Sequence, residues 1–239
     1  MATLSVILIT KNEEADLPAC LDSVSFADEI IIVDNGSTDM TPEIAKQYKA
    51  NFFTEDWHGF GPQKNLSLSK ASCDWVFSID ADEVVPPKLA NELKTVIEKP
   101  LFQGYVVPRA STFCGKKVRF GDWGRDKVLR LFKRNCGEFT NDQVHERVVV
   151  DGEVGLMKNA LVHHSVSSID DAKEKTYLYA EISAKDKKPS LLKAVLRSWW
   201  TFYRGYILRF GWLDGVVGFR IAKISAHGTF LRYTLGRKN

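Results

Sequence analysis

The stretch VFSIDADEVV, residues 76–85, decides how the sequence is read. A run of apolar residues stops abruptly there, and the acids Asp80, Asp82 and Glu83 follow within four positions. Like charges this close repel each other, by roughly 1 kcal/mol per pair near 4 Å in water and by more near a protein surface. We therefore expect these acids to face positive groups, or a metal ion with bound phosphates.

Around this stretch, short apolar runs alternate with segments of helical spacing, and such runs are typical of strands covered on both faces. Strands are predicted over Leu4–Ile9, Glu29–Val33, Asn51–Thr54 and Trp75–Ile79. Helices are predicted after a cap at Asn12, from Pro42, over 59–71, and from Pro86 to about Glu98. The alternation favours an α/β fold with a doubly wound, mostly parallel sheet.

The pattern changes after Gln103. Strands or hairpins without a helix are expected up to about His164, followed by a helix over Asp170–Lys187 and a helical segment over Leu191–Leu235. We therefore predict one domain over residues 1–165 and a C-terminal helical extension over residues 166–239.

The composition is that of an ordinary globular protein, with 44% hydrophobic and 26% charged residues. The net charge of +3 and the lack of an RNA-binding motif argue against a nucleic-acid partner. Four cysteines without CxxC spacing indicate reduced thiols. The N-terminus does not resemble a signal peptide, and no apolar run reaches the length of about eighteen residues that a spanning helix needs. We expect a cytoplasmic protein.

The C-terminal extension is basic and aromatic. From Lys185 to Asn239, lysines and arginines far outnumber the two aspartates, and there is no glutamate. Aromatic residues interleaved with arginines are typical of interfacial helices that meet anionic lipid headgroups. A helical appendage packed on the first domain, or a dimer interface, is the alternative.

In a doubly wound sheet, ligands bind outside the carboxyl ends of the strands. Three predicted strands deliver polar residues to that edge, namely Thr10, Lys11, Asn12, Glu13, Asp34, Asn35, Ser37, Asp80 and Asp82. Because residues two positions apart in an extended chain point the same way, Asp80 and Asp82 are expected to face one pocket. Mg²⁺ or Mn²⁺ takes one or two carboxylates plus substrate phosphates. The pair therefore indicates a divalent metal site, with a solvated turn as the alternative.

Family 2 glycosyltransferases are the known family that the sequence resembles, through ILITKNEEADLPACLDSV, EIIIVDNGSTDMTPEIAKQY and GFGPQKNLSLSKASCDWVFSIDADE. The resemblance implies an inverting enzyme with the GT-A nucleotide-diphospho-sugar transferase fold. Residues 1–100 would form the nucleotide-sugar-binding half of its catalytic domain and residues 101–165 the acceptor half. VHERVVVDG and RGYILRFGWLDGVVGF further resemble bacterial lipopolysaccharide core enzymes that add glucose to inner-core heptose.

The resemblance also implies roles for the residues at the matching positions of the donor half. Thr10, Asn12 and Glu13 would line the nucleotide pocket. Asp34 would hydrogen-bond the uracil ring of a UDP-sugar, with Ser37 beside it.

Further along the donor half, Lys64 of the Lys64-Asn65 pair would contact the nucleotide or its phosphates. Asp80 would meet the ribose or the sugar, and Asp82 would hold the Mg²⁺ or Mn²⁺ that bridges the diphosphate. His163 or His164 offers a further metal ligand, as a downstream His does in some GT-A enzymes, although a structural role is the alternative.

An inverting transfer needs a base for the acceptor hydroxyl, on the side of the sugar opposite the leaving group. FTNDQVHERV offers Asp142 and Glu146, and the resemblance favours Glu146. An ion pair of Glu146 with Arg147 or Lys133 is the alternative, and His145 would orient the base or pack in the core. Arg125 and Arg130 are expected to be solvated, with phosphate binding as the alternative.

The function expected from these features is transfer of glucose from UDP-glucose to an inner-core heptose of lipopolysaccharide, at the cytoplasmic face of the inner membrane. One alternative is transfer to a polyprenyl phosphate or another cell-envelope glycan. A nucleotidyltransferase would favour a glycine-rich loop after the first strand, where TKNEEAD is acidic instead. A non-catalytic carbohydrate- or membrane-binding protein would not need Asp34, Asp80, Asp82 and Glu146 together.

Overall fold

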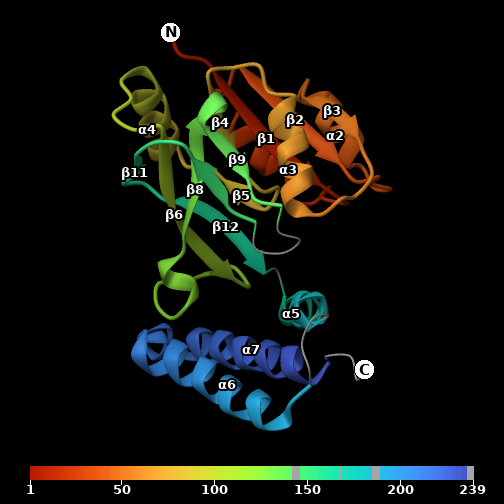
Figure 1. Ribbon diagram of the computed structural model, residues 1–239, viewed down its shortest axis with the longest axis vertical. Coiled ribbons are helices and arrows are strands. Elements are labelled where there is room, and N and C mark those ends of the chain that lie inside the picture. The colour runs from red at the N-terminus through yellow and green to blue at the C-terminus, as the bar shows by residue number, and fades with distance from the viewer. Residues whose placement is uncertain (142–145, 167, 185–188, 236–239) are drawn as a thin grey trace. The chain divides into compact units, whose positions relative to one another are not determined.

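The computed structural model in Figure 1 describes residues 1–141, 146–166, 168–184 and 189–235. The chain forms two compact units. The first comprises Met1–Arg109 and Lys127–His163, and the second comprises Ala110–Asp126 and His164–Asn239.

The first unit is built on a sheet with the strand order β3-β2-β1-β4-β8-β6. These strands are β3 (Asn51–Thr54), β2 (Glu29–Asp34), β1 (Leu4–Thr10), β4 (Trp75–Ser78), β8 (Lys127–Lys133) and β6 (Gly104–Phe113). β1 is parallel to β2 and β4, and β2 is parallel to β3. β8 is antiparallel to both β4 and β6. The predicted α/β fold is confirmed, with a parallel half followed by a mixed half.

Helices cover the sheet because successive residues of β1 face opposite sides. Val6 and Leu8 belong to a buried cluster that also holds side chains of three helices, whereas Ile7 belongs to a second buried cluster with Val76. The helices of this unit are α1 (Leu17–Ser23), α2 (Thr41–Gln47), α3 (Phe60–Ser69) and α4 (Pro87–Glu98). Burial on both faces explains why the strands read as nearly continuous apolar runs.

Short strands complete the first unit. β9 (Gly137–Phe139) pairs with β10 (Val148–Val150), and β11 (Val154–Leu156) lies parallel to β6. β5 (Glu83–Val84) pairs with β12 (Leu161–Val166), and this register sets His163 opposite Glu83. The β5–β12 pairing therefore brings a histidine from late in the chain to the acid run after β4.

The second unit is largely helical, as expected. Its helices are α5 (Ile169–Ala184), α6 (Leu191–Tyr203) and α7 (Gly215–Thr234), with the short strand β7 (Lys116–Lys117). A π-helical turn (Arg204–Leu208) and a 3₁₀ turn (Gly211–Asp214) join α6 to α7, which lie side by side in Figure 1. None of the helices in the described residues combines the length and the apolar character needed to cross a bilayer.

Candidate active site

The first cluster of polar residues lies at the carboxyl ends of β1 and β2, where Thr10 and Asp34 are register partners. The Thr10 hydroxyl donates to Asp34 Oδ1 at 2.9 Å. Ser37 donates to the same carboxylate from its backbone N–H at 2.7 Å and from its hydroxyl at 2.5 Å. Asp34 is 1% exposed. Three donors therefore fix the Asp34 carboxylate and tie the loop after β2 to β1.

Asn12 is not a helix cap, so that prediction is wrong. α1 begins later in the chain, and Asn12 has a left-handed backbone with φ 54°, which Asn adopts more readily than most residues. Its N–H donates to the Ser37 hydroxyl, and its Oδ1 accepts the N–H of Thr38, both at 2.8 Å. The N–H of Glu13 donates to the hydroxyl of the first residue of α2. Asn12 and Glu13 thus join the first loop to the second.

The acids after β4 do not lie in an extended chain, so the argument from strand geometry is wrong. β4 ends at Ser78, and the Glu83 N–H donates to the Asp80 carbonyl at 3.0 Å, which closes a turn. In this turn Asp80 and Asp82 meet different partners. Asp80 contacts Lys64 and Arg130, whereas Asp82 contacts His163.

Charged side chains of alternating sign run through the site. The Lys64 ammonium lies 2.8 Å from Glu146 Oε1 and 3.1 Å from Asp80 Oδ1. Arg130 lies 2.5 Å from Asp80 Oδ2 and 2.8 Å from Glu83 Oε1. Arg109 lies 3.3 Å from the same Glu83 oxygen. The order is Glu146, Lys64, Asp80, Arg130, Glu83 and Arg109. This alternation supplies the positive groups that the acid run requires.

Because the site is largely buried, its stability depends on each charged side chain having a partner of opposite charge. Glu83 is fully buried and Arg130 is 4% exposed, and charges so placed are stable only with partners. Burial raises the pKa of Glu83 above its usual range, and Arg130 offsets this only in part. Burial would also raise the pKa of Asp80, but the charges of Arg130 and Lys64 hold it well below its usual range. Burial opposes the charged form of Arg130, yet Asp80 and Glu83 raise its pKa.

Helix α3 holds the segment that leads to Glu146. The side chain of Asn65 donates to the Phe139 carbonyl at 2.8 Å and accepts the Phe139 N–H at 2.9 Å. A Cβ on Gly61 would lie 1.9 Å from the Thr140 carbonyl oxygen, so only glycine permits this approach. Together with the Lys64–Glu146 ion pair, these contacts hold Glu146, the candidate base, next to α3.

His163 Nε2 lies 3.2 Å from Asp82 Oδ2, and both side chains are partly exposed. The neighbouring His164 is exposed. Of the two histidines that the sequence offered, the structure therefore brings His163 to the acid run. His163 Nε2 and Asp82 Oδ2 are both atoms that can bind a metal ion, and they face each other beyond the end of β4.

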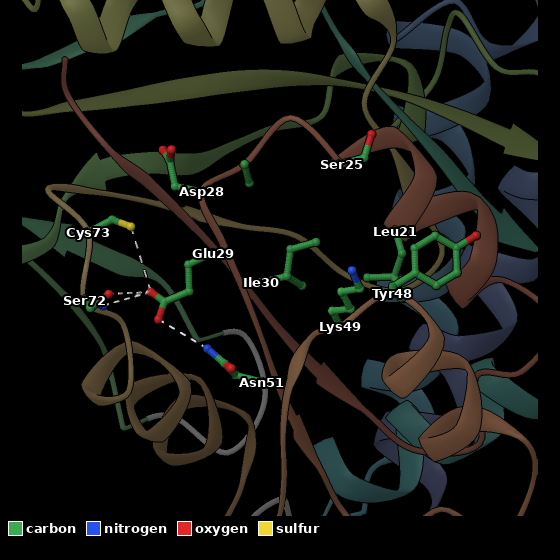
Figure 2. A pocket seen from close by; sticks show the side chains of 11 residues that line it. Leu21, Ser25, Asp28, Glu29, Ile30, Tyr48, Lys49, Asn51, Ser72 and Cys73 are labelled. Atoms are coloured by element: carbon green, nitrogen blue, oxygen red, sulfur yellow. Dashed lines mark hydrogen bonds between the residues drawn. The ribbon is translucent and has the colours of Figure 1, made fainter.

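A cavity of about 430 Å³ lies elsewhere, at the amino ends of β2 and β3. In Figure 2 the Glu29 carboxylate lines it and is held by Ser72 and Asn51. Glu29 also accepts the Ser5 hydroxyl at 2.6 Å. These bonds tie the loop before β4 to β1 and β2, and none of the site residues above lines the cavity. We assign it a structural role.

Comparison with known proteins places the chain in a family. Residues 5–152, more than half of the chain, match the sequence profile described as Glycosyl transferase family 2. The chain belongs to glycosyl transferase family 2. It is 31% identical over 241 residues to the lipopolysaccharide core biosynthesis glycosyltransferase LpsC of Rhizobium meliloti, covering 95% of this chain and 89% of LpsC. It is 30% identical over 250 residues to an uncharacterized glycosyltransferase of Rickettsia typhi, covering 97% and 86%.

The family assignment confirms that the protein is a glycosyltransferase, and a solved structure confirms the fold. Staphylococcus aureus TarS 1–349 in complex with UDP aligns with a TM-score of 0.50 at 16% identity, covering 95% of this chain and 80% of TarS. The sheet and helices of this chain are those of a GT-A glycosyltransferase.

The residues of this family 2 chain fit a divalent metal at Asp82. Among the described residues, no group of three or more His, Cys, Asp or Glu side chains could hold a metal ion. Asp82 and His163 nevertheless offer an oxygen and a nitrogen at one point. A divalent ion that keeps waters and binds substrate phosphates needs no more than one or two protein ligands. The donor set therefore suits an ion that arrives with a nucleotide diphosphate.

Sequence reasoning missed Arg109 and was wrong about Arg130, which is not solvated but buried and doubly ion-paired. Glu83 faces positive groups, as expected of the acid run, but its partners Arg130 and Arg109 were not foreseen. The burial of Arg130 could have been predicted from its position inside the apolar strand KVLRLFK, because an arginine that is buried there needs acidic partners. Asp142 and His145 lie outside the described residues, as does the side chain of Arg125.

Proposed function

We propose that this glycosyltransferase moves glucose from UDP-glucose to an inner-core heptose of lipopolysaccharide, with inversion at the anomeric carbon. The observation that carries the proposal is the Lys64–Glu146 ion pair. It brings an acid from the acceptor half of the sequence to the acids after β4, as an inverting transfer requires. The lipopolysaccharide core relative supports the acceptor class.

The loop cluster after β1 and β2 is the proposed nucleotide pocket, lined by Thr10, Asn12, Glu13, Asp34 and Ser37. An ionised carboxylate has about four lone-pair sites, and Asp34 accepts bonds from Thr10 and twice from Ser37. The remaining site suits the N3–H of a uracil ring. The hydrogen bonds of the cluster would hold Asp34 in place before the nucleotide binds.

The diphosphate would lie over Lys64 and the acid run, with the sugar at Asp80. Lys64 carries a charge that attracts phosphate oxygens, and Asp80 is fixed for the ribose or the sugar by Lys64 and Arg130. Asp82, with His163, would hold Mg²⁺ or Mn²⁺. When bound, the ion stabilises the negative charge that develops on the departing diphosphate.

Glu146 is the proposed base. One of its carboxylate oxygens takes the proton of the acceptor hydroxyl as the hydroxyl oxygen bonds to the anomeric carbon. The bond from that carbon to the diphosphate oxygen breaks at the same time, and UDP leaves. Lys64 holds the Glu146 carboxylate in place. The acceptor is anchored in lipid, so the reaction would take place at the cytoplasmic face of the inner membrane.

The test is transfer from UDP-glucose to a heptose-containing core acceptor, with and without Mg²⁺ or Mn²⁺, for wild type and Asp82→Ala. Asp151→Ala, in an exposed turn, is the control. We expect metal-dependent transfer that Asp82→Ala abolishes and the control retains, with a product of inverted configuration by NMR.

Other outcomes would revise the proposal. Metal-dependent UDP binding without transfer from UDP-glucose would refute the glucose donor. Transfer to a polyprenyl phosphate but not to heptose would refute the acceptor. If no nucleotide binds in the presence of metal, the assignment of the donor site is wrong.

A further inference from the structure

The α6 helix leaves a wide apolar surface uncovered. Trp199 is 62% exposed and Leu192 is 71% exposed, and their apolar neighbours on the helix are exposed as well. We call this surface the α6 face, and it consists of Leu191, Leu192, Val195, Leu196, Trp199 and Trp200. These residues recur at intervals of three and four positions, so they share one side of the helix. Contiguous exposed apolar surface of this kind marks an interaction site.

Other residues of α6 pack in the second unit, mostly against α7. Ala194 is fully buried, and the Thr201 hydroxyl lies 3.2 Å from the Thr229 hydroxyl of α7. Phe202 meets Phe219 of α7 edge to face, with ring centroids 5.8 Å apart. Ala194, Thr201 and Phe202 therefore anchor α6 without any contribution from the α6 face.

The turns between α6 and α7, together with the start of α7, expose a second set of large apolar side chains. They are Ile207, Leu208, Phe210, Trp212, Leu213 and, in α7, Val216. The backbone beneath them is closely packed, since a Cβ on Gly211 would lie 2.6 Å from the Gly205 carbonyl oxygen. A Cβ on Gly218 would lie 1.8 Å from the Gly211 carbonyl oxygen. The turns thus present these side chains from a fixed backbone.

The charge around this surface is positive. Asp214 is the single acid between Leu191 and Thr234, and its carboxylate accepts the backbone N–H groups of Arg119 and Phe120. Exposed basic side chains without an acidic partner among the described residues are Lys193, Arg197, Arg220 and Lys223. Lys193 and Arg197 are one helical turn apart on α6, next to the α6 face. A second copy of the same surface would bring like charges together, which disfavours self-association.

We propose that the helical unit binds the surface of an anionic phospholipid bilayer. The α6 face and the apolar turn residues enter the boundary between headgroups and acyl chains, and Lys193 and Arg197 contact lipid phosphates. Apolar burial and attraction to anionic lipid both contribute to binding of this type. The inference rests on the proposed function in one respect. Binding to the bilayer would bring the enzyme to an acceptor that is anchored in lipid.

The test is flotation of the full-length protein with vesicles of phosphatidylcholine, alone or mixed with phosphatidylglycerol. We expect binding to the mixed vesicles that weakens with added salt. Leu196→Glu should lower the partition coefficient at least about tenfold, since it puts a charge at the apolar boundary. Arg197→Gln should lower it about fivefold, the effect of one basic residue near such a surface. Leu101→Glu, at an 82% exposed leucine of the first unit, is the matched control and should bind like wild type.

Three results would overturn the proposal: no binding to either vesicle, equal binding to both, or a Leu196→Glu variant that binds like wild type. A dimer of the free protein that Leu196→Glu dissociates, seen by size-exclusion chromatography with light scattering, would identify the surface as a contact between copies. UDP binding measured on the same samples separates this test from that of the proposed function. Vesicle binding without UDP binding would refute only the proposed function, and UDP binding without vesicle binding only this inference.

Discussion

The Lys64 ammonium lies 2.8 Å from the Glu146 carboxylate, although 82 positions separate the two residues in the sequence. The same ammonium lies 3.1 Å from Asp80. One cation of α3 therefore joins an acid that follows β4 to an acid that precedes β10. Two segments that are far apart in the sequence therefore meet at this point.

Replacing Glu146 with glutamine should remove the base and leave the nucleotide site intact. We expect kcat to fall by about 10²–10⁴, the usual contribution of a positioned base. The affinity for UDP should stay as in wild type, because the proposed nucleotide contacts are made by other residues. Glu98→Gln, at an exposed glutamate that ends α4, is the matched control. Wild-type turnover by Glu146→Gln would exclude Glu146 as the base.

Replacing Lys64 with methionine should destabilise the first unit, because Glu146 and Asp80 would face each other without the cation. Removing one partner from a buried pair costs about 3–5 kcal/mol. The Asp80 side chain is 33% exposed, so we discount this to about 1–3 kcal/mol for solvent screening. Urea unfolding of the variant measures the loss.

The matched control for Lys64 is Lys70→Met, at the end of the same helix. Lys70 pairs with Glu55 at 3.3 Å, with the two side chains 23% and 38% exposed. A pair of this kind contributes about 0–1 kcal/mol. The double variant Lys64→Met/Glu146→Gln should lose less stability than the sum of the single variants, because the two side chains interact. Additive losses would show that the ion pair does not contribute to stability.

Gly61→Ala should displace the segment that carries Glu146. The new Cβ would lie 1.9 Å from the Thr140 carbonyl oxygen, which is backbone and cannot rotate away. Thr140 is hydrogen-bonded to Arg147, the neighbour of Glu146, through its N–H at 2.9 Å and its hydroxyl at 3.0 Å. We expect a stability loss of about 1–3 kcal/mol and a lower kcat, measured by thermal unfolding and turnover.

Gly104→Ala is the control for this prediction. Its Cβ would meet a Val150 methyl group at 3.1 Å, and a side chain can shift by a few tenths of an ångström. The control should therefore lose less stability and keep its turnover. Equal effects of the two substitutions would mean that the close approach of α3 does not position Glu146.

The sequence predicted the parts of this protein that local patterns determine. β3 has the predicted bounds, and the other parallel strands differ by about one residue, because apolar runs between polar turns are local signals. The partners of the acids could not be read in this way. Arg130 reaches Glu83 across 47 positions and Lys64 reaches Glu146 across 82, and no local pattern encodes such pairings.

The geometry after β4 also escaped prediction, for a different reason. The spacing of Asp80 and Asp82 suits both an extended chain and a turn, and the choice depends on the bond from the Glu83 N–H to the Asp80 carbonyl. Asn12 is likewise a residue type that often caps helices, but its N–H donates to the Ser37 hydroxyl instead. A polar residue near a strand end has several possible hydrogen-bond partners, and tertiary contacts select among them.

Replacing His163 with alanine should weaken metal binding. If His163 and Asp82 hold the divalent ion together, loss of the nitrogen should raise the Kd for Mn²⁺ in the presence of UDP by at least about 10–100-fold, the effect of removing a group that only supports a metal ligand. Calorimetric titration of Mn²⁺ into the protein with UDP measures this without turnover. His164→Ala, at the exposed neighbour, is the matched control. Equal affinities for the two variants would show that His163 has a structural role.

Acid should destabilise wild type more steeply than Asp80→Asn. Although burial would raise the pKa of Asp80, Arg130 and Lys64 hold it well below its usual range. A carboxyl with a lowered pKa stabilises the fold above its unfolded pKa, about 3.9 for Asp, and this stabilisation is lost as the pH falls through the folded value. Unfolding free energies from urea titrations on either side of about pH 4 measure the slope.

The asparagine variant cannot lose this stabilisation, because its side chain does not titrate. Its unfolding free energy should be lower than that of wild type at neutral pH, where Arg130 and Lys64 lack one charged partner, and the difference should shrink as the pH falls. Asp151→Asn, in an exposed turn, should follow the wild-type slope. A difference between wild type and Asp80→Asn that stays constant with pH would show that Asp80 is bound by its hydrogen bonds alone, without a net contribution from its charge.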